Sequence, residues 1–486
     1  MPAGSNHGLP ATDRALISKW LGVYVLIWVI AFVFAPTFFT PNLPILLPSI
    51  AAMAIFLCFC LWLRFQVQDN IFGEIGFIYL AFALAYTVFP AYGFLTLDSL
   101  SSWVGLPILE TLGPDQAELG LHLWRHVLFI GAVGAGYLLF RGRHTPKFGS
   151  LDDFGVTEKD FGVTEKSIAP FLFVIIMISI VMLWLLSSPV NTYLDNYTRY
   201  DNLSWLGKRV VTVCTVLKTG GTFVLLTMLF SKYEQYRKYI WSFVLLRTIQ
   251  EVLGSHGARI DAFMILIAAT VLYHYCVKQI TFKKTLVVTL ALIVTFAAIA
   301  TVRLGVFDAS EQSATTDFDF GELGAVFIPG FQLYAERSMG TLPPIPWQLF
   351  FDDFISIVPL ANDKEWQPMY WWTDNYAPDA VVPPITLGPI ALSALWGGEF
   401  FLLLEGFING ILFAYLMRWF AKNGGSWRVM TVYAFCYSTC VMCLKYSIFF
   451  HLAPLVRTIL PMVLIVSVLA KGFQGGTKLA RIASPA

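Results

Sequence analysis

Long apolar runs recur along most of this chain and constrain its fold more than any other feature. The runs are roughly 18 to 25 residues long, and about 20 helical residues span the hydrocarbon core of a bilayer. Charged residues make up 13% of the 486 residues, about half the share usual in soluble proteins. Because lipid offers no hydrogen-bond partners, a spanning segment satisfies its backbone within a helix. The sequence therefore predicts an all-α polytopic membrane protein.

A hydropathy window of about 19 residues places about twelve spans in the chain. The predicted spans are 20–38, 44–63, 72–95, 124–140, 168–190, 209–230, 239–253, 260–277, 285–302, 387–417, 428–446 and 457–471. The tenth is long, and we expect a re-entrant piece before Gly397 and Gly398.

These spans divide the chain into three parts. The first, 1–302, holds nine spans and a cytoplasmic loop at 141–167. A large outer loop follows at 303–386, and 387–486 holds the last three spans and a cytoplasmic tail.

The distribution of basic residues predicts the orientation. With both termini in the cytoplasm, 20 of the 32 Lys and Arg residues fall in the inner segments. Most of the acidic residues fall on the other side. This is the positive-inside bias of bacterial and other inner membranes, so we expect a multi-pass protein with cytoplasmic termini.

The outer loop at 303–386 is too long for a simple connector. It is rich in aromatic residues, which argues against disorder. We expect a folded, partly helical periplasmic cap on the membrane surface, with an amphipathic helix at Trp347–Val358.

Several ionisable residues lie within the spans or at their outer ends. An intramembrane charge costs about 2.5–3.5 kcal/mol on insertion scales and often marks function. The alternative is a structural ion pair or a side chain that reaches the interface. For Arg125, Lys208 and Arg209, at span edges, the structural interpretation is favoured. For Lys218, well inside its span, pairing with an acid and a functional role are equally open. The other residues of this kind are Arg247, Glu251, Arg259, Asp261, Glu399, Glu405, Lys445, His451 and Arg457.

Five arginines map to the outer face from different segments: Arg199, Arg259, Arg303, Arg337 and Arg457. A guanidinium fork suits bidentate phosphate binding and keeps its charge in a partly dry site. The pattern favours a pyrophosphate site at the headgroup boundary. Tryptophans of the outer loop, Trp371 and Trp372 among them, would suit the apolar faces of sugars.

Familiar soluble-enzyme motifs are absent from the sequence. There is no Walker A loop, no HExxH, no GxSxG and no His/Cys set with zinc spacing. We therefore predict no metal ion, no cofactor and no nucleic-acid partner.

Three segments resemble one family. The stretch GSHGARIDAFMILIAATVLYHYCVKQITFKK at Gly254–Lys284 has Gly-Ser and an Arg at the outer end of a span, then an apolar stretch and a basic inner turn. Two further segments carry the likeness. After the large loop comes GGEFFLLLEGFINGILFAYL, and the last span is introduced by KYSIFFHLAPLVRTILPMVLI. This arrangement, over about 190–472, resembles the bacterial Wzy-type repeat-unit polymerases of O-antigen and exopolysaccharide and the related O-antigen ligases.

Two positions depart from the family pattern. The family has an Arg after Gly-Ser where this chain has His256, with Arg259 three residues later. The phosphate role is open between these two residues. Glu405-Gly406 stands where the family often has Phe-Gly.

The resemblance implies a GT-C-like, metal-independent glycosyltransferase of the bacterial inner membrane. It would join polyprenyl-diphosphate-linked oligosaccharide units on the periplasmic face, with polyprenyl diphosphate as the leaving group. Membrane lipid and a chain-length regulator are implied partners. The implied diphosphate ligands are Arg259, Arg337 and Arg457, then Arg303 and Arg199. The general base is one of Glu399, Glu336, Asp352 and His451.

Three alternatives remain. An O-antigen ligase shares the architecture but transfers glycan to a lipid core; the lack of a His in the large loop favours the polymerase. A lipid-linked oligosaccharide flippase would be expected to show inverted repeats, and no repeat relates the two halves. A transferase using polyprenyl-phosphate sugars typically has an acidic pair in the first outer loop, which here contains no acid.

Overall fold

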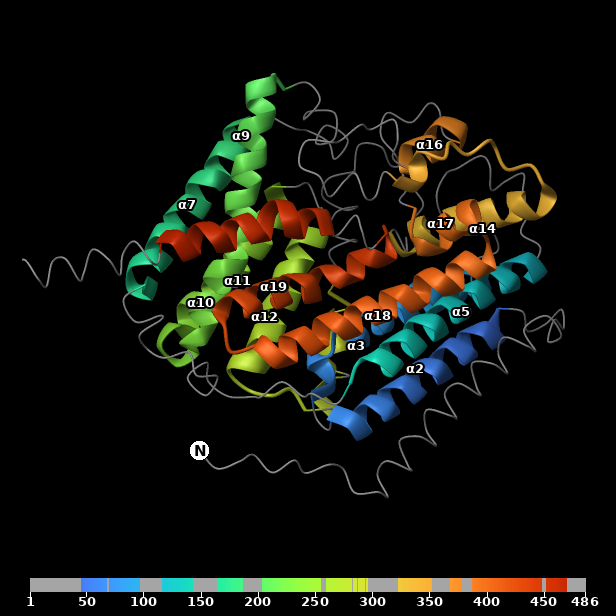
Figure 1. Ribbon diagram of the computed structural model, residues 1–486, viewed down its shortest axis with the longest axis horizontal. Helices are drawn as coiled ribbons and strands as arrows, with labels where there is room; N and C mark the ends of the chain where they lie inside the picture. The colour runs from blue at the N-terminus through green and yellow to red at the C-terminus, as the bar shows by residue number, and fades with distance from the viewer. Residues whose placement is uncertain are drawn as a thin grey trace, which may run out of the picture.

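The computed structural model shows a bundle of helices, and all regular elements in the part of the chain it describes are helical (Figure 1). The described residues are 45–67, 70–96, 116–142, 164–186, 203–254, 259–281, 283–285, 287–292, 294–295, 322–351, 368–376, 387–447 and 452–469.

The elements follow the chain in this order: α2 (Leu46–Val67), η1 (Asn70–Gly73), α3 (Ile75–Thr96), α5 (Gln116–Phe140), α7 (Thr164–Leu186), α9 (Trp205–Thr215), η3 (Val216–Gly220), α10 (Gly221–Ser231), α11 (Tyr233–Gly254), α12 (Arg259–Cys276), α14 (Glu322–Met339), α16 (Pro368–Tyr376), α17 (Pro389–Trp396), α18 (Glu399–Asn423), α19 (Trp427–Thr439), η5 (Cys440–Leu444) and η6 (Leu455–Ile459).

Seven helices within the described residues are long and apolar enough to cross a membrane. They are Leu46–Val67, Glu118–Phe140, Ile168–Leu186, Trp205–Ser231, Glu399–Asn423, Trp427–Leu444 and Leu452–Leu469. Shorter apolar helices cover Ile75–Pro90 and Asp261–Cys276. Together with the apolar composition, these helices indicate a membrane protein.

The predicted spans overlap observed helices where both are described, but those at 72–95, 239–253 and 260–277 are not among the seven helices of membrane length. The tenth predicted span is divided before Glu399, because α17 ends at Trp396 and α18 begins at Glu399, and its re-entrant course stays a prediction. Gly398 lies between the two helices with φ +64°, a left-handed conformation that favours glycine. The first predicted span, 20–38, lies outside the described residues.

The closest contact between helices joins α5 and α18. A Cβ atom added to Gly410 would lie 2.2 Å from the carbonyl oxygen of Val133, and one added to Gly136 would lie 2.3 Å from that of Phe407. Glycines at these positions let the two backbones touch, as is common between helices in membranes. The α5–α18 pair thereby holds the start of α18 beside the third turn of α5.

A buried polar network joins the end of α5 to the start of α3. Arg141 donates from Nε to Glu74 Oε2 at 2.8 Å and from Nη2 to the other carboxylate oxygen, and both side chains have no exposed surface. The Tyr137 hydroxyl donates to the same carboxylate at 2.5 Å. The hydroxyls of Tyr275 and Tyr433 donate to the Gly73 carbonyl oxygen, so α12 and α19 join the network.

The helices form two groups with α19 between them. In Figure 1, α7, α9, α10, α11 and α12 lie on one side of the molecule and α2, α5, α14, α17 and α18 on the other. Helix α19 packs against α10 and α12 of the first group and against α18 of the second.

Helix α14 lies in the segment that the sequence places in the outer loop, and its middle is buried. Residues 326–335 of α14 are buried, and the helix packs on α3, α5 and α17. The described part of 303–386 is thus partly helical, with α14 as its longest helix, and its place on the outer face stays a prediction. Of the expected helix at Trp347–Val358, the structure describes 347–351, with helix at 349–351.

Candidate active site

Charged side chains gather at the start of α18, which faces the third turn of α5. Arg125 Nε donates to Glu399 Oε1 at 2.9 Å. The Arg125 side chain is 10% exposed and that of Glu399 is 52% exposed, so the pair has a buried cation and an open carboxylate. The first turn of a helix favours an acid such as Glu399, because the free N–H groups carry partial positive charge. We call this group, with Tyr334, Glu336 and Arg337 of α14, the Arg125–Glu399 site.

Tyr334 supports the buried cation from α14. The guanidinium carbon of Arg125 lies 3.9 Å from the centre of the Tyr334 ring, a cation–π contact. The Tyr334 hydroxyl lies 2.8 Å from the Ser393 hydroxyl on α17. Burial raises the pKa of Tyr334 to about 12, so the phenol keeps its proton at physiological pH. Arg125 is thereby held between an aromatic face and the Glu399 carboxylate.

Arg337 closes the end of α17. Its Nη1 donates to the carbonyl oxygen of Ala394 at 2.7 Å and to that of Leu395 at 3.5 Å. These carbonyls belong to the last turn of a helix, where arginine is favourable. The Arg337 side chain is exposed, and its Nε would lie 3.4 Å from a Cβ atom on Gly398. One edge of the guanidinium is thus anchored and the rest faces the start of α18.

Glu336 is fixed through both of its oxygens. Gln332 Nε2 donates to Oε1 at 3.1 Å, and the Tyr376 hydroxyl donates to Oε2. Burial raises the pKa of Tyr376 and the hydrogen bond to Glu336 raises it further, so Tyr376 acts as a donor at physiological pH. Glu336 therefore links α14 to α16.

Comparison with protein-family models, with curated proteins and with solved structures finds no match for this chain. The chemistry of the site is therefore inferred from its own residues.

Trp371 and Trp372 brace α16 against this region. The Trp372 side chain is fully buried, and its ring centre lies 5.3 Å from that of Tyr376. Trp371 is also buried, and its Nε1 donates to the Pro344 carbonyl oxygen at 3.3 Å. The sequence predicts sugar contacts for both rings. In the structure both rings are buried and pack beside Tyr376 instead.

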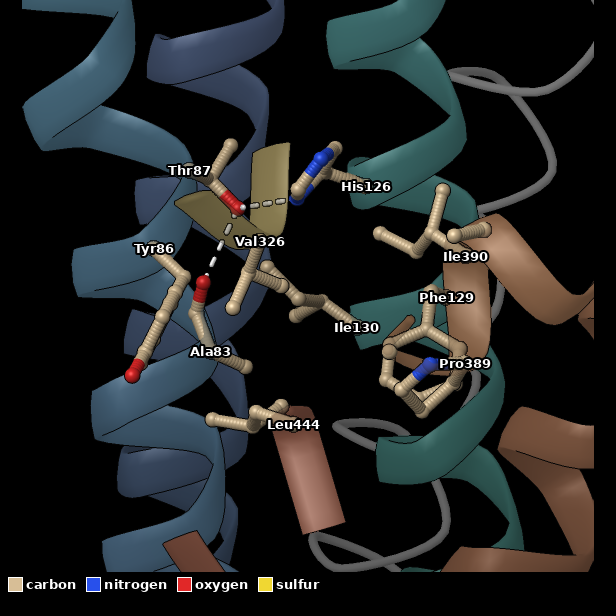
Figure 2. A pocket seen from close by; sticks show the side chains of 12 residues that line it. Ala83, Tyr86, Thr87, His126, Phe129, Ile130, Val326, Pro389, Ile390 and Leu444 are labelled. Carbon is tan, nitrogen blue, oxygen red and sulfur yellow. Dashed lines mark hydrogen bonds between the residues drawn. The ribbon is translucent and has the colours of Figure 1, made fainter. Parts of the chain in front are cut away.

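An apolar pocket adjoins the site (Figure 2). It is lined by Ala83, Tyr86, Thr87, His126, Phe129, Ile130, Val326, Gly388, Pro389, Ile390, Ala391 and Leu444. Figure 2 shows the His126 ring beside the Thr87 hydroxyl, 3.3 Å from Nδ1 to Oγ1. The pocket lies between α3 and α17. The turn of α17 that follows the lining residues holds Ser393 and Ala394.

The predicted site residues fall into separate places. Glu399, Glu336 and Arg337 come together with the two tryptophans at the α17 end of the bundle. Arg457 lies on η6, which packs on η3 and α19. Arg259 is the first residue of α12, and its side chain is not among those described. The remaining candidates, Asp352, His451, Arg303 and Arg199, lie outside the described residues.

Sequence reasoning missed three residues of the site. Arg125 is interpreted as a structural residue at a span edge, and its ion pair with Glu399 agrees with that interpretation, but the sequence does not indicate which acid it meets. Tyr334 and Tyr376 carry no sequence signal beyond their place among aromatic residues of the large loop. Within the described residues there is no group of three or more His, Cys, Asp or Glu side chains that could hold a metal ion.

Proposed function

We propose that this protein polymerises polyprenyl-diphosphate-linked oligosaccharide units by glycosyl transfer at the Arg125–Glu399 site. The observation that carries the proposal is the meeting of Glu399 and Arg337 at the start of α18. These residues come from two segments separated by the α16–α17 region, and each was a candidate for this chemistry on sequence grounds.

Glu399 is the general base in this proposal. A base must reach the hydroxyl from which it takes a proton. Glu399 has 52% of its side chain exposed and is held through Oε1 alone by the described residues. Glu336 accepts hydrogen bonds on both oxygens. Its carboxylate is therefore better suited to positioning than to proton transfer.

The reaction is a displacement at the anomeric carbon of the donor glycan. A hydroxyl of the acceptor attacks that carbon while its proton passes to Glu399. The new C–O bond forms as the bond to the diphosphate breaks, and polyprenyl diphosphate leaves with the electron pair. The proton on Glu399 is then released to water, which restores the carboxylate.

Arg337 stabilises the leaving group. Negative charge grows on the diphosphate as the C–O bond breaks, and a preorganised cation stabilises this charge without a reorganisation cost. Because Nη1 is anchored on the end of α17, the guanidinium is already oriented when substrate arrives. Arg125 serves a different purpose, since its buried side chain orients Glu399.

The proposal includes the finer architecture expected from the sequence. It places about twelve spans in a bacterial inner membrane, with GT-C-like organisation, cytoplasmic termini and the Arg125–Glu399 site on the periplasmic face. The start of α18 and the start of α5 are outer ends in that topology, which supports a site facing the periplasm.

The test is deletion of the gene in its native host, with surface polysaccharide separated on a gel beside strains complemented with the wild type and with Glu399→Gln. We expect deletion to reduce a ladder to a single-repeat band, and Glu399→Gln to fail to restore the ladder at normal protein level. An unchanged ladder after deletion would overturn the proposal for that glycan. Polymer that is made but not attached to lipid would support a ligase, and repeat units trapped inside the cell would support a flippase.

A further inference from the structure

A second charged cluster lies in the other group of helices, and its lysine is on a helix of membrane length. Lys218 is the central residue of the helix Trp205–Ser231, with thirteen residues on either side. Its Nζ lies 3.1 Å from Glu251 Oε1 and 3.2 Å from Oε2. Arg247 Nη2 lies 2.5 Å from the same Oε1. We call Lys218, Arg247 and Glu251 the Lys218 cluster.

The cluster has more donors than its carboxylate can satisfy. Two cations share Glu251, and Arg247 uses Nε for the Thr222 hydroxyl at 3.3 Å. Arg247 is 1% exposed, and its Nη1 has no hydrogen-bond partner among the described residues. A buried donor of a charged group is unfavourable when it has no hydrogen-bond partner. The cluster therefore contains a built position for an additional acceptor.

The backbone at the cluster departs from a regular helix in two facing segments. Lys218 lies on η3 and Arg457 on η6, and both segments are π-helical turns that pack against each other. A Cβ atom added to Gly220 would lie 2.9 Å from the Thr458 carbonyl oxygen. Single π turns inside α-helices occur frequently at functional sites. Here they bring Lys218 and a second basic residue to neighbouring turns.

A purely structural ion pair explains this arrangement poorly. Lys218 lies in the middle of a helix of membrane length, where charged side chains are rare, and buried ion pairs often add no stability over apolar side chains of similar size. Asp261 of α12 is close enough to interact electrostatically with all three members of the cluster. Such a collection of charges in a dry environment, with an unused guanidinium edge, is typical of a binding site for a charged ligand.

We infer that the Lys218 cluster binds the diphosphate of the acceptor, the second lipid-linked substrate. The inference rests on the proposed function. In that reaction both substrates carry a polyprenyl diphosphate. The acceptor reacts through a hydroxyl on its sugars and keeps its own diphosphate at the other end of the oligosaccharide. Its diphosphate must therefore lie away from the reacting atoms, in a second anion site.

The two charged groups fit this requirement. Arg337 serves the donor diphosphate beside Glu399, and the Lys218 cluster lies in the other group of helices (Figure 1). Arg247 Nη1 and Lys218 Nζ are the donors that contact the acceptor diphosphate. Glu251 is the resident anion that holds both cations in place before the substrate binds.

The test measures how many equivalents of farnesyl diphosphate bind the full-length protein in detergent, by native mass spectrometry and by isothermal titration. We expect two equivalents for the wild type and one for each of Lys218→Met and Arg247→Met, with at least tenfold weaker affinity at the lost site. Arg337→Met should lose the other equivalent. Lys208→Met, on the same helix as Lys218 but at its edge, is the matched control and should keep both.

Glu251→Gln separates a ligand site from a structural ion pair. Removing the resident anion should tighten the second equivalent several-fold in a protein that elutes as the wild type does on size exclusion. The inference would be overturned if Glu251→Gln lost the folded protein while Lys218→Met kept both equivalents, as Lys218→Arg and Arg247→Lys do. Lys218→Arg keeps the charge and should keep both equivalents.

Further measurements identify the source of the diphosphate. They also show whether a negative result concerns the second site or the proposed function. Inorganic pyrophosphate should compete weakly and phosphatidylglycerol in mixed micelles should not compete; equal competition by either would assign the cluster to a soluble anion or to bulk phospholipid and overturn the inference. If the wild type bound one equivalent and Lys218→Met also bound one, the second site would be overturned and the proposed function would stand. No binding by the wild type would count against both, and the deletion experiment would then decide the proposed function alone.

Discussion

Arg125 Nε lies 2.9 Å from Glu399 Oε1, and this contact joins the third turn of α5 to the start of α18 through two residues that are 274 positions apart in the chain. The cation is buried beneath the Tyr334 ring, whereas half of the Glu399 side chain is exposed. The pair therefore presents a carboxylate that is fixed on one side and open on the other. That asymmetry is what a general base requires, because it must be oriented and still reach the substrate.

Replacement of Glu399 by Gln should abolish polymerisation. The amide keeps the size of the side chain and can still accept a hydrogen bond from Arg125, but it cannot take a proton. General-base catalysis contributes about 10²–10⁴-fold, so we expect kcat to fall by at least 100-fold with KM nearly unchanged. The measurement is chain extension by purified protein with a lipid-linked repeat unit.

Glu336→Gln is the matched control in the same site. Its carboxylate is fixed by Gln332 and by Tyr376, so the variant should lose activity through looser packing of α16, by about tenfold or less. If Glu336→Gln lost more activity than Glu399→Gln at equal expression, the two acids would exchange roles in the mechanism.

Arg125→Met should lower activity through Glu399 rather than directly. The buried cation orients the carboxylate and makes no contact with solvent-exposed substrate, so it is a positioning residue. We expect a drop of about tenfold or more in kcat, because the Glu399 carboxylate is no longer held in its orientation. In the double variant with Glu399→Gln the Arg125 change should have little further effect, as expected for two residues that act as a unit. Additive losses in that double variant would show that Arg125 acts independently of Glu399.

The sequence predicts the helical spans well because each span is a local pattern. Hydropathy alone locates α2, α5 and α18, and two adjacent glycines locate the break between α17 and α18. Glu399 at that break is recognisable because an acid at the end of an apolar run is unusual. These features depend only on residues close together in the chain.

Contacts between distant segments are beyond such local patterns. Arg125 stands at a span edge, where basic residues commonly reach the interface, and nothing near it indicates Glu399. Helix α14 contains Pro329 and charged ends, so hydropathy assigns it to the loop although its middle is buried. The Glu74–Arg141 pair is likewise formed by two span ends that only the folded bundle brings together.

Gly410→Ala should disrupt the packing of α18 on α5. The added methyl group would lie 2.2 Å from the Val133 carbonyl oxygen, and a backbone atom cannot rotate away. Overpacking of this kind costs about 1–3 kcal/mol. We expect a lower melting temperature in detergent, together with reduced activity because the Arg125–Glu399 contact spans the same two helices. Gly207→Ala, whose nearest neighbour is 3.3 Å away on a side chain, should be nearly neutral.

Removal of one partner of the Glu74–Arg141 pair should destabilise the protein more than removal of both. Arg141→Met leaves a carboxylate with no exposed surface and without its cation, which typically costs about 3–5 kcal/mol. In Glu74→Gln with Arg141→Met the buried charge is gone, so much of the lost stability should return. Melting temperatures of the single and double variants in detergent measure this difference. Equal destabilisation in all variants would mean that Tyr137 and the Gly73 contacts carry the stability at this end of the bundle.

Arg337→Lys tests whether the planar guanidinium is needed as well as its charge. Arg337 holds the Ala394 carbonyl with Nη1 while the rest of the fork stays exposed beside Gly398. A lysine ammonium is a single point charge, so it cannot close α17 and bind a phosphate in the bidentate manner of arginine. We expect a protein that folds and that loses about 10–100-fold in kcat, with a smaller change in KM because the leaving group gains charge in the transition state. Arg337→Met should be less active still. Its melting temperature should also fall by a few degrees, because the contact at the end of α17 is lost and such a contact is worth about 1 kcal/mol. Wild-type kcat in Arg337→Lys would limit this residue to closing α17, and the donor diphosphate would then have to be stabilised by another cation of the site.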